Sequence, residues 1–257
     1  MTRTGRGHVR ASGVWPGLAA VLLFLGAIPL AWAVPPPPVQ SALAALKQGG
    51  SELASGWRYQ ETITGSKGKA RLAYDPSRRA GERWTVVKVN GKAPDEAARK
   101  RLKARVDKRS QSAGKRLGIG SGWLASSDYK LLRKTPTTLV YQLRPKVGAN
   151  SDKATAKLLS HLAGELTIAR DDHRPLSLRL DNFESFSPKF GVKINAFGFR
   201  AKFKRLAHSG PVVVVRTSNF ARGKVFWFKG FNDETRVELF DFAPVAASAP
   251  APQSADD

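Results

Sequence analysis

Short runs in which apolar and polar residues alternate fill most of this chain, and this period of two constrains its fold most strongly. The alternation is clear in Trp57–Ile63 and in the longest run, Phe190–Leu206, and the short apolar run Lys224–Lys229 also predicts a strand. Turn-forming residues such as Asn90-Gly91 separate the runs, as expected for antiparallel strands joined by hairpins. About eleven such runs predict an α+β fold that is mainly antiparallel β, and we expect a curved half-barrel covered by two or three helices.

Three segments interrupt the alternation with apolar residues at helical spacing. Gln40–Leu53 predicts a short helix that Gly49-Gly50 breaks, and Pro94–Arg109 and Ser151–Leu162 predict two more helices. In the longest strand the apolar residues change parity, so we expect a β-bulge near Gly198.

The first 33 residues have the pattern of a bacterial export signal. Three arginines precede the apolar stretch Leu18–Leu30, and Ala31-Trp32-Ala33 offers the small residues that a signal peptidase reads. We expect cleavage after Ala33 and a periplasmic protein. The alternative is an uncleaved anchor, since Val14–Ala33 is just long enough to span a bilayer. The expected organisation is a signal peptide (1–33), a Pro-rich linker (34–39), one folded domain (40–242) and a disordered Ala/Pro-rich tail (243–257).

Charge and cysteine content narrow the possible partners. The first 33 residues contain three of the 43 Lys and Arg and none of the 20 acidic residues, so the remaining chain has a net charge of +20. Such a chain attracts polyanions, and outside the inner membrane we expect lipid phosphates and lipopolysaccharide rather than nucleic acid. High charge can also reflect solubility alone. Cysteine is absent, which excludes a lipid anchor at the cleavage site, thiol nucleophiles and cysteine zinc sites.

Nothing in the sequence argues for catalysis, and we expect no enzyme activity, no metal and no cofactor. The segment Asp171-Asp172-His173 could ligate a metal, but an Asp-rich hairpin turn is the preferred interpretation. A hydrolase would need paired carboxylates facing one cleft, which spacing alone cannot show. The candidates for such a pair are Glu61, Asp75, Glu82, Glu165 and Glu184.

Two groups of residues are candidates for binding. Aromatic residues on predicted strands would line a ligand cavity if they face inward on a curved sheet, and would pack under helices if the sheet is flat. Basic residues on the predicted helix 95–109 would bind an anionic surface, unless they form only a solvated helix face. The cavity candidates are Trp57, Tyr59, Trp84, Tyr141, Phe197, Phe199 and Phe203, and the anion-binding candidates are Arg99, Lys100, Arg101, Lys103 and Arg105.

The order of these elements resembles that of the LolA/LolB-like periplasmic proteins: an export signal, a short helix, paired strands, inserted helices and further strands. The run Tyr74–Trp84 and the following Val89–Pro94 are similar to a segment of uncharacterised proteobacterial members. The resemblance implies a half-open antiparallel barrel capped by helices. It also implies a non-enzymatic carrier or sensor of lipidated or lipid-like ligands.

Two functions therefore remain open at this point. The preferred hypothesis is a periplasmic binding protein for a lipid, a lipoprotein or another amphiphile, with the apolar part of the ligand in the barrel and its anionic head near Lys and Arg. The alternative is a cell-envelope scaffold that binds polyanions through the basic helix and has no cavity.

Overall fold

A computed structural model describes residues 34–66, 68–102, 122–146, 153–226 and 228–245. These residues all belong to one unit within residues 32–257. The predicted signal peptide, the tail beyond residue 245 and Ser151, the expected start of a helix, lie outside the described residues.

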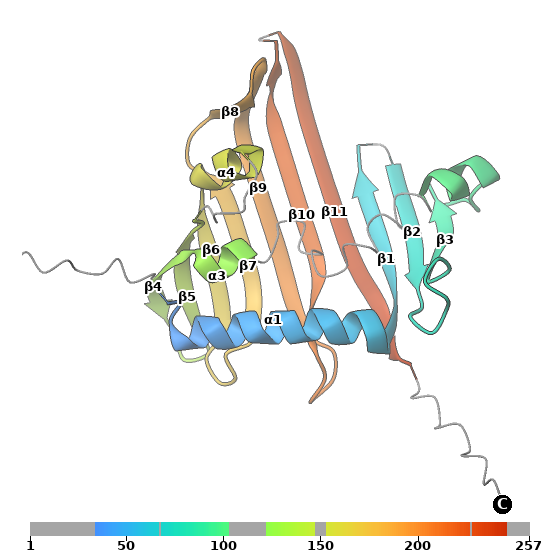
Figure 1. Cartoon of the computed structure of the whole chain (residues 1–257), viewed down its shortest axis with the longest axis horizontal. Helices are drawn as coiled ribbons and strands as arrows, with labels where there is room; N and C mark the ends of the chain where they lie inside the picture. Colours follow the sequence, from blue (N-terminus) through green and yellow to red (C-terminus); the bar gives the residue numbers. More distant parts are fainter. Residues whose placement is uncertain (1–33, 67, 103–121, 147–152, 227, 246–257) are drawn as a thin grey trace, which may run out of the picture. The chain divides into compact units, whose positions relative to one another are not determined.

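Eleven antiparallel strands form a single open sheet (Figure 1). Its order is β3-β2-β1-β11-β10-β9-β7-β6-β5-β4, and β8 pairs with β9 outside this path. The expected α+β, mainly antiparallel fold is confirmed. The strands are β1 (Trp57–Gly65), β2 (Gly68–Tyr74), β3 (Trp84–Val89), β4 (Asp128–Lys134), β5 (Thr138–Arg144), β6 (Leu162–Ala169), β7 (Pro175–Asn182), β8 (Phe186–Lys189), β9 (Val192–Arg205), β10 (Val212–Val225) and β11 (Lys229–Pro244).

One long helix, α1 (Pro37–Gly56), crosses a face of this sheet near one end of its strands (Figure 1). The shorter helices α3 (Gly122–Ser126) and α4 (Lys153–Ser160) contribute buried side chains to the apolar cluster beneath α1. Residues 96–102 are also helical, and Asp95 accepts a hydrogen bond from the Ala98 amide at 2.6 Å, as an N-cap residue does. The sequence pattern does not predict α3 as a helix.

The start and the continuity of α1 differ from the sequence-based expectation. The helix begins at Pro37, inside the expected linker, because a proline in the first turn lacks only an N–H that would have no helical partner. It also runs through Gly49-Gly50 without a break. Gly49 is buried, and a Cβ at this position would collide with the backbone carbonyl of Val212 in β10. Glycine is therefore present because the helix and the strand approach closely.

Two apolar clusters lie under the two halves of α1. Val39 and Ala42 in its first half belong to a large cluster built from α3, α4, β5, β6, β7, β9 and β10. Leu53 in its second half packs in a smaller cluster with Tyr59, Leu72 and other residues of β1, β2, β3 and β10. The helix thus joins two cores that the sheet alone would leave separate.

The opposite face of the sheet carries charged side chains. Arg216 on β10 forms an ion pair with Glu238 on β11 at 2.9 Å, and Arg200 on β9 forms one with Asp181 on β7 at 2.7 Å. These residues alternate along their strands with the apolar residues that face α1. One face is covered and the other is polar, as is common in antiparallel sheets.

The expected bulge in β9 is present, three residues before Gly198. The β9–β10 register shifts between the pairs Arg222↔Ala196 and Gly223↔Ile194, so Asn195 is the extra residue. The Asn182 side chain satisfies the backbone around it: its Nδ2 donates to the Asn195 carbonyl at 3.2 Å, and its Oδ1 accepts from the Phe197 amide at 2.6 Å. The bulge returns the apolar residues on both sides to one face.

The predicted strand Lys224–Lys229 is wrong. The structure continues β10 to Val225, turns, and begins β11 at Lys229. A run of apolar residues over so few positions does not distinguish a strand from the end of a hairpin. The register between β10 and its neighbours, which is set many residues earlier, decides where the turn falls.

Candidate functional site

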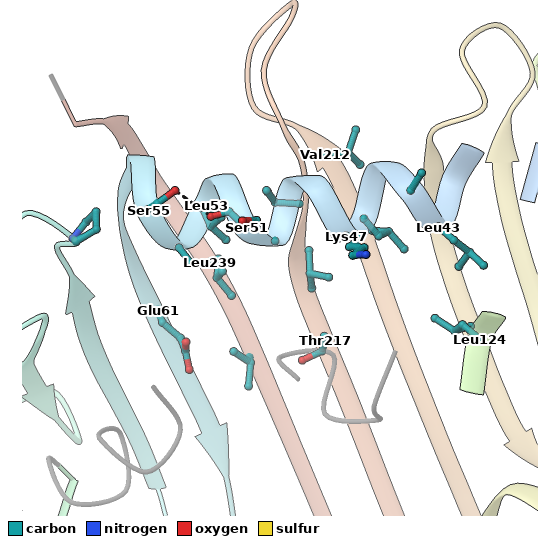
Figure 2. A pocket seen from close by; sticks show the side chains of 18 of the residues that line it. Leu43, Lys47, Ser51, Leu53, Ser55, Glu61, Leu124, Val212, Thr217 and Leu239 are labelled. Atoms are coloured by element: carbon teal, nitrogen blue, oxygen red, sulfur yellow. Dashed lines mark hydrogen bonds between the residues drawn. The ribbon is translucent and has the colours of Figure 1, made fainter. Parts of the chain in front are cut away.

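A mainly apolar trough of about 1050 Å³ lies between α1 and the sheet (Figure 2). Its size is at the upper end of the range for small-molecule sites. Thr217 of β10, Leu239 of β11 and Glu61 of β1 lie along the strands below the helix (Figure 2). The remaining described lining residues are Leu43, Ala44, Leu46, Lys47, Gly50, Ser51, Leu53, Ala54, Ser55, Pro76, Arg83, Trp84, Gly122, Leu124, Ala125, Val212, Val213, Val214 and Val237.

Small residues on α1 help to keep the trough open. Lys47, Ser51 and Ser55 recur every four residues along the helix, which places them on one side of it. Gly50 and Ala54 also line the trough. Because α1 approaches β10 so closely at Gly49, larger side chains on this side would fill the space above the strands.

Three charged residues are among the described lining residues. Glu61 is a buried carboxylate, with 5% of its surface exposed, on the strand face that α1 covers. Lys47 is exposed on α1, and Arg83 is half-buried just before β3. The site thus offers apolar walls, one carboxylate and two cationic side chains, which suits an amphiphile better than a sugar or a nucleotide.

The second half of α1 is held beside the trough by a packed aromatic cluster. The Tyr74 hydroxyl donates a 2.6 Å hydrogen bond to the Ala54 carbonyl, one of the last four carbonyls of the helix. The Tyr74 ring lies 5.0 Å from that of Tyr59 and 4.9 Å from that of Trp84, measured between centroids. These contacts fix one end of the roof of the trough.

The seven aromatic cavity candidates mostly pack in the two cores. Tyr141, Phe199 and Phe203 are buried in the large cluster, and Phe197 packs against it. Tyr59 is buried in the small cluster, and Trp57 packs against that one. Trp84 alone of the seven lines the trough. Burial also raises the pKa of the Tyr141 phenol.

Apart from Trp84, the residues that line the trough are not predicted as cavity residues by the sequence pattern. On α1, Lys47, Ser51 and Ser55 make a stripe of polar residues at a spacing of four. That stripe is the signal that could have indicated a helix side facing an open space. The other half of the site, Thr217, Val237 and Leu239, depends on strand register, which the sequence pattern left undetermined.

The basic candidates divide into two groups. Arg99, Lys100 and Arg101 are exposed within the helical residues 96–102, and Lys103 and Arg105 lie outside the described residues. Arg99 lies next to β3, where it lines a shallow depression together with Arg78 and Glu82. None of these three helical residues is among the described lining residues of the trough.

The candidate carboxylates do not meet at the trough. Glu165 pairs with Gln142 and Arg179 on the strand face opposite α1, and Glu184 lies 3.0 Å from Nδ1 of His161. Asp75 accepts hydrogen bonds from Ser77 in the turn after β2, which lower the pKa of its carboxyl. Among the described lining residues, Glu61 is the one carboxylate.

The Asp-rich turn between β6 and β7 has a structural role. Oδ2 of Asp172 accepts hydrogen bonds from Arg174 at 2.7 Å and from Arg205 at 3.0 Å. Partial burial raises the pKa of this carboxyl, but the hydrogen bonds from the two arginines outweigh that effect and leave the pKa well below its usual value. In the described part of the chain, no three His, Asp or Glu side chains gather as metal ligands would.

We compared this chain with known proteins, and two of the solved structures similar to it contain MucB. No family model matches the chain, and no curated protein matches it. The crystal structure of MucB in complex with MucA(peri) is 12% identical, covers 81% of this chain and 100% of that one, and has a TM-score of 0.22. The Pseudomonas aeruginosa MucA/MucB complex is 11% identical, covers 82% and 99%, and has a TM-score of 0.21. At these TM-scores, conclusions about this chain rest on its own geometry.

The helices also bear on membrane association. Among those in the described residues, not one combines the length and the apolar character that a bilayer span requires.

Proposed function

We propose that this chain is a LolA/LolB-like periplasmic protein that binds a lipid, a lipidated ligand or another amphiphile, without catalysing a reaction. The observation that carries the proposal is the apolar trough between α1 and the sheet. The apolar part of the ligand lies against Val212, Val214 and Leu239. Its anionic head is bound by Lys47 or Arg83, the two cationic side chains among the described lining residues.

The lining supports a binding role because it is mainly aliphatic. Aliphatic side chains from α1, β10 and β11 supply most of the walls, and such surfaces gain stability when an apolar chain displaces water. Among the described lining residues Glu61 is the one carboxylate, whereas a hydrolytic acid/base pair uses two.

The test is to fill the trough from within. Thr217 faces it from β10, and the next residue, Ser218, points to the opposite face of the same strand. Thr217→Phe should weaken binding of the anionic amphiphile 1-anilinonaphthalene-8-sulfonate by about tenfold or more, since occupied space is no longer available to the ligand. Ser218→Phe is the matched control and should leave the affinity unchanged.

Native mass spectrometry of the protein after purification provides an independent measurement. We expect co-purified lipid in the wild type and in Ser218→Phe, and much less in Thr217→Phe. Wild-type protein that carries no lipid and does not bind the fluorescent amphiphile would overturn the proposal.

The exposure of Arg99, Lys100 and Arg101 favours one second candidate, an envelope scaffold that binds polyanions. Binding of lipopolysaccharide or DNA would then fall steeply with salt, and replacing these three residues by alanine would reduce that salt dependence. Amphiphile binding in the trough should not respond to the same triple substitution.

A further inference from the structure

Two neighbouring turns form the end of the sheet that lies farthest from α1 (Figure 1). One connects β8 to β9, and the other connects β10 to β11. They are in direct contact: Val225 pairs with Val192, and the Phe226 amide donates a 2.6 Å hydrogen bond to the Gly191 carbonyl. We call Phe190, Phe226 and Phe228 on these turns the aromatic tip.

The aromatic tip exposes large apolar side chains to solvent. Phe190 is 86% exposed, Phe228 is 85% exposed and Phe226 is 52% exposed. Single exposed apolar residues are common on protein surfaces, but three phenylalanines on two adjoining turns form a patch, and such patches mark sites of interaction.

The backbone of the tip is held in an uncommon conformation. Phe226 has a φ of +47°, which is rare for a bulky residue, and its ring lies against Gly191, itself at φ +75°. A Cβ at Gly191 would lie 2.9 Å from Cε1 of Phe226. The glycine therefore allows the Phe226 ring to pack on the neighbouring turn, and the two turns present one surface.

Lysines surround the aromatic tip. Lys189, Lys193, Lys224 and Lys229 are all exposed on the flanks of the two turns. Lys193 and Lys224 are directly opposite each other in the β9–β10 register, an arrangement of like charges that destabilises a sheet. The sequence has no Asp or Glu between Glu184 and Asp233, so no acidic residue within β8, β9 or β10 offsets them. An external anion would relieve this repulsion.

We infer that the aromatic tip docks on the surface of an anionic lipid bilayer. Phenylalanine rings enter the boundary between headgroups and acyl chains, and the flanking lysines contact lipid phosphates. This combination of apolar residues with a ring of cations is what binding to an anionic interface requires. A second copy of the chain fits the tip poorly, because it would bring four more lysines against these four.

Docking through the aromatic tip does not require a ligand in the trough, although β10 extends from the trough to the tip. Thr217 in the trough and Val225 at the tip are both in β10, eight residues apart. At about 3.3 Å per residue this separation is roughly 26 Å. A docked protein would thus hold the trough away from the bilayer, at the far end of the strands that reach it.

Sedimentation with lipid vesicles tests the inference on the full protein. We expect binding to equimolar phosphatidylglycerol and phosphatidylcholine, and weak or no binding to phosphatidylcholine alone. The double variant Phe190→Ser with Phe228→Ser should lose about tenfold or more in vesicle affinity, because exposed rings no longer enter the interface. Phe183→Ser is the control, since Phe183 is 62% exposed but lies outside both turns.

Lysine substitutions and the trough variant Thr217→Phe distinguish docking of the tip from ligand binding in the trough. Replacing Lys193 and Lys224 by alanine should weaken binding to the anionic vesicles by about fivefold per lysine, and added salt should abolish the difference. Thr217→Phe should bind vesicles like the wild type even where it loses the fluorescent amphiphile. Circular dichroism checks that each variant is folded.

Two results would overturn the docking inference. One is a wild-type protein that does not sediment with the anionic vesicles. This includes the case in which analytical ultracentrifugation shows a dimer that the Phe190→Ser, Phe228→Ser variant no longer forms. The other is a double variant that binds vesicles as well as Phe183→Ser does. Neither result would affect the proposed trough, because Thr217→Phe tests it separately.

Discussion

Replacing Gly49 by alanine tests how α1 is held against the sheet. Gly49 is buried where the helix crosses β10, and an added Cβ would collide with the Val212 carbonyl. The neighbouring Gly50 is in the same helix and has no atom within 4 Å of an added Cβ. The two glycines thus form a matched pair in which only one is required by packing.

The expected effects have opposite signs. Alanine favours the interior of a helix over glycine by about 1 kcal/mol, and Gly50→Ala should gain up to this amount. At Gly49 the same gain is opposed by overpacking against a backbone atom, which costs about 3 kcal/mol because the helix must shift. We expect Gly49→Ala to lower the free energy of unfolding by about 2 kcal/mol. The two variants should therefore differ by about 3 kcal/mol.

Urea unfolding, followed by tryptophan fluorescence, measures this difference. With a denaturant slope of about 2 kcal/mol per molar, the two midpoints should separate by about 1.5 M. A midpoint for Gly49→Ala that equals or exceeds that of Gly50→Ala would refute the reasoning. It would mean that neither glycine is required by the approach of α1 to β10 and that both act only through their low helix propensity.

Two other contacts give measurable expectations. Tyr74→Phe removes the hydrogen bond to the Ala54 carbonyl at the end of α1. In the same urea assay it should lower the free energy of unfolding by about 1 kcal/mol. An unchanged midpoint would show that this hydrogen bond does not hold the helix. Asp172→Asn should destabilise the protein at pH 7 by at most about 1 kcal/mol, since the carboxylate is partly exposed. Because the pKa of Asp172 is lowered by folding, its stabilisation is full above the usual 3.8 and is lost as the pH falls toward the folded value. Thermal unfolding should thus show a smaller difference between wild type and Asp172→Asn at pH 2 than at pH 7. A difference that does not shrink over this range would contradict the ion-pair explanation.

The sequence pattern predicted the fold well where local signals decide it. Asn90 and Gly91 both have positive φ, at 49° and 82°, as the Asn-Gly turn required. The change of parity in β9 predicted a bulge within three residues of its place. Alternation carries this information because a strand exposes successive residues to opposite faces.

Contacts between segments that are distant in the sequence determine the features that the sequence pattern did not predict. Gly49-Gly50 has the local pattern of a helix break, but the carbonyl of Val212, more than 160 residues later in the chain, is the reason for one of the two glycines. All seven aromatic candidates lie on strands, as the sequence predicts. Whether they pack or line a cavity depends on the height of α1 above the sheet, which no residue of those strands determines. Thr217 and Leu239 became site residues through register alone.

The pairing of β1 with β11 has a consequence for the order in which the chain can fold. β1 lies along β11 from Trp57 opposite Pro244 to Gly65 opposite Thr235. In the sheet, β1, β2 and β3 reach the other strands only through β11. Contacts between such distant parts of a chain slow folding. The sheet formed by β4 to β10 can assemble earlier, but the first hairpin of the domain must wait, unpaired on one edge, until the last strand is available to close the structure.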